Sequence, residues 1–166
     1  MKHVIQLHLE HKTDVIREIE IPSKRSLKDL HNIIIENLKL DKNEMASFYT
    51  TNEDLELLEE IPLFKIDTEE NSMSDMTEIT IESVFPNINS QLIYIYDFLK
   101  MWRFLISYSK VTENKSDTID VTNCIGEMPK EAPEIMFKTK EGFDAQQTLN
   151  GFDYDEDFEN LNETEY

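Results

Sequence analysis

Two side chains of this sequence, His31 and Asp97, have the chemical types that acid–base catalysis requires. A histidine and a carboxylate can move protons, but only where they converge in one pocket. His31 lies one helical turn after Leu27, at the edge of an apolar stripe, and a histidine placed there is more often a core-boundary residue with a hydrogen-bonded ring than a ligand. The pair therefore leaves two interpretations open: a hydrolytic or metal-dependent site, or two structural residues.

The sequence contains no motif for nucleotide binding or for cysteine-based chemistry. The chain has three glycines, too few for a P-loop or a dinucleotide-binding fingerprint. Cys124 is the single cysteine, so it can form neither an intramolecular disulfide nor a cysteine-based zinc site. We therefore expect no cofactor, no metal and no catalytic residue that the sequence alone identifies, and a cytoplasmic location.

The charge of the chain, -19, is concentrated in two segments. Residues 51–90 carry eleven acidic side chains and one basic, and residues 141–166 carry nine acidic and none basic. Such runs are typical of solvated segments, and they repel phosphate backbones. We predict one α+β domain over residues 1–139 with an acidic loop at about 66–76, followed by a disordered acidic tail over residues 140–166, and no primary role in nucleic-acid binding.

The most apolar stretch, residues 91–111, predicts a central β-hairpin. Leu92, Tyr94, Tyr96 and Phe98 on one face alternate with Ile93, Ile95 and Asp97 on the other, and a second alternating run begins at Trp102. A transmembrane span is excluded by three charged residues within the stretch, Asp97, Lys100 and Arg103. We place a turn at residues 99–101 and expect the alternating aromatic residues to form the core.

The other elements follow from local patterns. Residues 3–9 and 14–21 alternate and predict an opening hairpin, and residues 23–40 predict the main helix, with Ser26 and Asp29 forming a capping box. Strands are expected at residues 45–51 and 60–65, a helical turn at 78–85 and an edge strand at 120–124. These elements predict an α+β fold with a mixed or antiparallel sheet and one helix packed on it.

Three separated patterns carry a resemblance to a known family. They are Arg17-x-Ile19-x-Ile21-Pro22, Ser26-Leu27-x-Asp29-Leu30-His31-x-x-Ile34 and Tyr94-x-Tyr96-Asp97-Phe98-x-x-x-Trp102, followed by Cys124 and Pro133-Glu134. In this order they resemble the plasmid pRiA4b ORF-3-like family, also described as insertion-element passengers of a TnpR type, and its acidic Bacteroidetes-like branch in particular. The resemblance implies a bacterial α+β protein with a ubiquitin-like, β-grasp start.

The sequence departs from the family pattern where polar residues are expected. Members typically read Tyr-Asp-Phe-Gly-Asp-x-Trp-x-His, whereas this chain has Leu99, Lys100 and Phe104 in place of the Gly, Asp and His. A His-x-His after the helix is replaced by residues 44–46, Glu-Met-Ala. Any metal or catalytic site formed by those groups in relatives is therefore dismantled here.

The family residues that remain are candidates for an interaction or a structural motif: Arg17, His31, Tyr96, Asp97 and Trp102. Asp97 is expected to pair with Arg17 or Arg103 across strands, and Trp102 is expected in the core. These residues favour a non-enzymatic protein-interaction module, associated with mobile elements, that binds an unknown protein as a monomer or weak homodimer and does not enter a membrane. The alternatives are an enzyme that uses His31 and Asp97 and an accessory of transposition.

Overall fold

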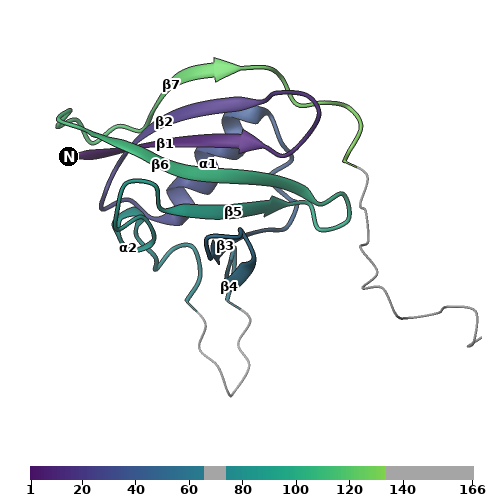
Figure 1. The fold of residues 1–166 in the computed structure, drawn as a ribbon, viewed down its shortest axis with the longest axis horizontal. Coiled ribbons are helices and arrows are strands. Elements are labelled where there is room, and N and C mark those ends of the chain that lie inside the picture. Colours follow the sequence, from purple (N-terminus) through teal and green to yellow (C-terminus); the bar gives the residue numbers. More distant parts are fainter. Residues whose placement is uncertain (66–73, 134–166) are drawn as a thin grey trace, which may run out of the picture. The chain divides into compact units, whose positions relative to one another are not determined.

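The computed structural model describes residues 1–65 and 74–133, which form one antiparallel sheet with a helix packed on it (Figure 1). The seven strands are β1 (Lys2–Leu9), β2 (Ile16–Pro22), β3 (Ala46–Thr51), β4 (Leu57–Pro62), β5 (Gln91–Tyr96), β6 (Trp102–Thr112) and β7 (Asp120–Ile125), and the two helices are α1 (Leu27–Leu38) and α2 (Ile81–Val84). Most of the acidic loop predicted at about 66–76, and the tail predicted at 140–166, lie outside the described residues.

The strand order in the sheet is β4-β3-β5-β6-β1-β2-β7, and every neighbouring pair is antiparallel. The predicted opening hairpin is β1 and β2, and the predicted central hairpin is β5 and β6. Strand β7 lies at one edge, as predicted, and β4 lies at the other. The α+β fold class is thus confirmed, with an antiparallel rather than mixed sheet, while the β-grasp start remains a prediction.

Helix α1 begins where its sequence supplies a cap. The Ser26 hydroxyl accepts a hydrogen bond from the Asp29 amide at 3.1 Å, and the Asp29 carboxylate accepts one from the Ser26 amide at 3.2 Å. This reciprocal capping box confirms the prediction and makes Leu27 the first helical residue, later than the predicted residue 23. The helix ends before Lys39, whose φ of 56° is left-handed.

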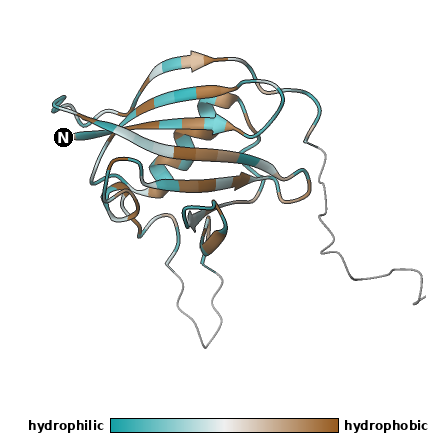
Figure 2. Cartoon of the chain, viewed as in Figure 1, coloured by the Kyte–Doolittle hydropathy of each residue, from teal (hydrophilic) through white to brown (hydrophobic). Residues whose placement is uncertain are grey.

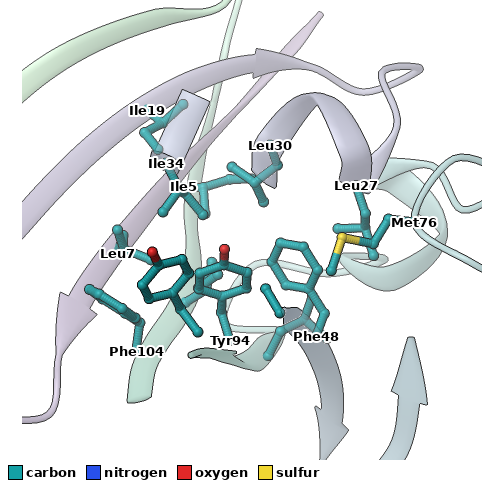
Figure 3. Packing of buried hydrophobic residues seen from close by; sticks show 14 of the residues in the cluster. Ile5, Leu7, Ile19, Leu27, Leu30, Ile34, Phe48, Met76, Tyr94 and Phe104 are labelled. Carbon is teal, nitrogen blue, oxygen red and sulfur yellow. The ribbon is translucent and has the colours of Figure 1, made fainter. Parts of the chain in front are cut away.

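The core lies between α1 and the covered face of the sheet. Figure 3 shows Leu27, Leu30 and Ile34 of the helix facing the rings of Phe48, Tyr94 and Phe104. The ring centroids of Phe48 and Tyr94 are 4.7 Å apart, and those of Tyr94 and Phe104 are 5.9 Å apart. Apolar residues follow one another along β5 and the middle of β6 in Figure 2, as expected for strands at the centre of a sheet.

Two sequence expectations about strands need correction. Strand β4 covers Leu57–Pro62 rather than residues 60–65, because its first residues are exposed at the sheet edge and show no alternation of buried and exposed positions. Phe98, expected on the same face as Tyr96, is partly exposed, because β5 ends at Tyr96 and the following turn redirects the chain. Among the described residues no helix is both long and apolar enough to cross a membrane.

Candidate functional site

His31 projects from α1 into the core and contacts a tyrosine of β5. Its side chain is buried, with an exposed fraction of 3%, and its Nδ1 lies 2.9 Å from the hydroxyl oxygen of Tyr94. Burial, together with the smaller effect of the nearby positive charge of Lys28, lowers the pKa of His31 from 6.5 to about 4. The imidazole is therefore neutral near pH 7.

The bond between His31 and Tyr94 fixes which ring nitrogen carries the hydrogen. Burial raises the pKa of Tyr94, so its hydroxyl keeps its proton. The Tyr94 hydroxyl forms its hydrogen bond with His31, and burying an O–H group without an acceptor would destabilise the fold. The phenol therefore donates to Nδ1, and the hydrogen of the imidazole resides on Nε2.

A cleft of about 490 Å³ runs along α1 beside His31. We call it the α1 cleft; it is lined by Lys28, His31, Asn32, Ile35, Glu36, Leu40 and Lys42. The ammonium group of Lys28 lies 5.3 Å from the centre of the Phe64 ring, and burial lowers its pKa, although the Asp75 carboxylate opposes this. The cleft thus combines two lysines, one carboxylate, a neutral imidazole and an aliphatic wall.

Asp97 forms the turn between β5 and β6 rather than a site with His31. Its carboxylate oxygen Oδ1 accepts hydrogen bonds from the amides of Leu99 and Lys100, both at 3.1 Å, and its φ of 56° is left-handed. Its carbonyl also accepts from the Met101 amide. An aspartate is favoured in such a turn because its side chain hydrogen-bonds to the backbone two residues on. The acid–base pairing of His31 and Asp97 therefore gains no support from their contacts.

Arg17 joins β2 to the end of α1 and to β7. Its guanidinium donates to the side-chain oxygen of Asn37, to the carbonyls of Ile16 and Ile125 at 2.8 Å, and to the carbonyl of Gly126 at 3.0 Å. Because these carbonyls and the nearby helix C-terminus carry partial negative charge, they stabilise a guanidinium whose exposed fraction is 6%. Arg17 thus acts as a clamp between three segments of the fold.

The prediction that Asp97 forms an ion pair with Arg17 or Arg103 is wrong. Asp97 pairs instead with Lys100, at 3.8 Å, and Arg103 pairs with Glu10, at 2.8 Å. The reason is topological, since β6 and β1 separate β5 from β2 in the sheet. Asp97 also follows the last residue of β5, and the β5 residue that pairs with Arg103 is Ile95.

The two remaining candidates are packed at the end of the central hairpin. Tyr96 and Trp102 are register partners on β5 and β6, and both belong to the buried core. The hydroxyl of Tyr96 donates to the carbonyl of Asp41 at 2.8 Å, which fixes the loop after α1. The core position predicted for Trp102 is confirmed.

An exposed apolar surface lies on edge strand β4. Leu58 has an exposed fraction of 59%, and Leu57 is also exposed. Beside it is a groove of about 900 Å³. This β4 groove is lined by Thr50, Leu58, Glu59, Glu60, Ile61, Ser74, Ile79, Ser83, Val84 and Pro86. Glu60 is engaged inside the sheet, where it accepts hydrogen bonds from Ser47 and Tyr49.

Sequence reasoning missed the residues that surround the α1 cleft and the β4 groove. Tyr94 was assigned to the core face without a polar partner, because its contact with His31 joins residues 63 positions apart. Lys28 could have been found, since it precedes His31 by three residues and such pairs are neighbours on a helix. Within residues 1–65 and 74–133, no group of three or more His, Cys, Asp or Glu side chains is arranged to hold a metal ion.

The fold and these sites define a mostly-β α+β protein with a seven-strand antiparallel sheet and one main helix. The chain belongs to the plasmid pRiA4b ORF-3-like family, whose model matches residues 2–162. It is similar in fold to a crystal structure of a protein of unknown function, MM3350 from Methanosarcina mazei Go1, with a TM-score of 0.60 and 18% identity over 74% of this chain and 68% of that chain. No curated protein matches the sequence.

The structure shows what occupies the positions where family members typically carry polar residues. Phe104 is fully buried, and its ring packs beside that of Tyr94 as part of the aromatic core. Leu99, with an exposed fraction of 91%, lies at the tip of the turn that Asp97 forms. In this chain the positions thus serve packing and turn formation.

Proposed function

We propose that this protein is a non-enzymatic protein-interaction module that binds an extended, basic segment of another protein along β4. The observation that carries the proposal is the exposed apolar surface of β4 beside the β4 groove. Strand β4 is at the sheet edge, and the carbonyl of its last residue, Pro62, already accepts from the Met76 amide. The backbone groups offered to an added strand are therefore those of residues 57–61 that face away from β3. Exposed leucines on such an edge supply apolar contacts for that strand.

The charge around β4 indicates the chemistry of the partner. Residues 51–64 contain five acidic side chains and no basic one. A segment that alternates apolar residues with lysine or arginine would place its apolar residues against Leu58 and the groove and its cations near Glu59. Because two β4 edges paired with each other would juxtapose these acids, the same charges disfavour self-association, and we propose a monomer.

The opposite sheet edge gives a contrast within the same molecule. Strand β7 exposes the polar residues Thr122 and Asn123 and ends at Ile125, whose exposed fraction is 46%. Leu58 and Ile125 are therefore both exposed apolar residues on edge strands, but only Leu58 lines the β4 groove. This makes Ile125→Lys a matched control for Leu58→Lys.

The test is selection of random twelve-residue peptides displayed on phage against the immobilised full-length protein. We expect enriched peptides to alternate apolar and basic residues, to lose at least about tenfold in affinity with Leu58→Lys, and to bind the Ile125→Lys variant unchanged. A variant that lacks residues 141–166 serves as a second control, because those residues carry nine acidic side chains. Peptides that lack basic residues, or that depend on the tail and not on Leu58, would refute the proposal.

A further inference from the structure

His31 presents an unused hydrogen-bond donor to the α1 cleft. Its Nδ1 accepts from Tyr94, so Nε2 carries the ring hydrogen, and Nε2 has no hydrogen-bond partner among the described residues. Nε2 is not fully enclosed by protein atoms, so it can donate to water or to a ligand at the surface. His31 therefore offers one N–H donor to an acceptor that occupies the cleft.

The charges that face the cleft favour an anionic acceptor. Lys28 and Lys42 line it together with His31, and the charge of Lys28 is close enough to act on the imidazole. Glu36 is the one acidic side chain in the lining, and Asn32 adds an uncharged amide. Asp75 acts on Lys28 from outside the cleft. In a chain of charge -19, this is a local excess of positive charge beside a free N–H donor.

The remaining lining is aliphatic, supplied by Ile35 and Leu40. A bare inorganic ion would leave this surface uncovered, whereas a carboxylate with a short hydrocarbon chain would bury it. We propose that the α1 cleft binds a small organic carboxylate, whose oxygens accept from His31 and contact Lys28 and Lys42 while its chain packs on Ile35 and Leu40. This site is independent of the function proposed for β4, because no residue of β4 lines the cleft.

The test is an NMR titration of the full-length protein with hexanoate, observed at the ring resonances of His31. We expect saturable shifts with a Kd of about 1 mM, as is reasonable for a ligand of this size. Bound carboxylate favours the protonated imidazole, so the pKa of His31 should rise from about 4 when hexanoate is present. Acetate should bind about tenfold more weakly, because it lacks the methylene groups that cover Ile35 and Leu40.

Two further comparisons distinguish the contribution of the ligand's charge from that of its size. Hexanamide has the size of hexanoate without its charge and should leave the pKa of His31 unchanged. Lys42→Met should weaken hexanoate binding about fivefold, while Lys12→Met, at an exposed lysine in the β1–β2 turn, should not change it. The proposal is overturned if His31 does not respond to hexanoate, if hexanamide or inorganic phosphate binds as well, or if Lys42→Met has no effect.

Discussion

The neutral, buried imidazole of His31 makes folding sensitive to mild acid. The pKa of His31 is about 4 in the folded chain and 6.5 when it is exposed. Between these values the unfolded chain binds a proton that the folded chain does not, so stability contributed by His31 is present above pH 6.5 and is lost as pH falls. From pH 7 to pH 5 this loss amounts to about 2 kcal/mol in the free energy of unfolding.

The assay is urea denaturation at pH 7 and pH 5 of the wild-type chain and of His31→Asn. An asparagine side chain places an oxygen near the position of Nδ1, so it can still accept from Tyr94, but it does not titrate. All other titrating groups, including His3, whose pKa is also lowered by burial, are common to both proteins. We expect wild type to lose about 2 kcal/mol more than the variant. Equal losses would show that His31 is not held neutral in the core, and would refute the reasoning.

Three further predictions concern residues that hold the backbone, each measured as the free energy of unfolding in urea. Arg17→Lys should cost about 2–3 kcal/mol, because an ammonium group cannot reproduce the guanidinium contacts. Arg103→Lys, at a half-exposed arginine that pairs with Glu10, should cost under about 1 kcal/mol. Equal costs for Arg17→Lys and Arg103→Lys would show that Arg17 does not hold β2, α1 and β7 together. Asp97→Ala should cost about 1–2 kcal/mol, and Asp97→Asn much less, because asparagine keeps an oxygen that accepts from the turn amides. Equal costs for the two variants would show that these hydrogen bonds do not stabilise the turn. Gly126→Ala should cost more than about 2 kcal/mol, because φ is +70° and an added Cβ would clash with the Asp14 carbonyl oxygen, and a neutral result would contradict that packing.

The parts of the fold that depend on neighbouring residues were predictable from sequence. The capping box joins Ser26 and Asp29, which are three positions apart, and the alternation from Trp102 onward lies within one strand. The strands around the two hairpins were found for the same reason. The ion pair predicted for Asp97 failed because it depended on the order of strands, which local patterns do not contain. The pairing of Asp97 with Arg17 required β5 and β2 to be neighbours, and they are not.

The candidate sites were less predictable, because each is formed by residues distant in the chain. His31 was identified by type and position, but its partner Tyr94 is brought to it only when β5 packs beneath α1. The exposure of Leu58 could not be read from sequence either, since an apolar residue in a strand is normally expected to be buried. Only its place on the edge strand explains its exposure.

The position of β1 in the sheet has a consequence for how the chain is made. Strand β1 pairs on one side with β2, but its partner on the other side, β6, follows about a hundred residues later: Leu9 pairs with Phe104 and Lys2 with Thr112. At ribosomal rates of roughly 5–20 residues per second, the opening hairpin emerges with one unpaired edge and waits about 5–20 seconds for β6. During each round of synthesis that nascent edge is open to chaperones and to other nascent chains, so sheet closure comes late in translation.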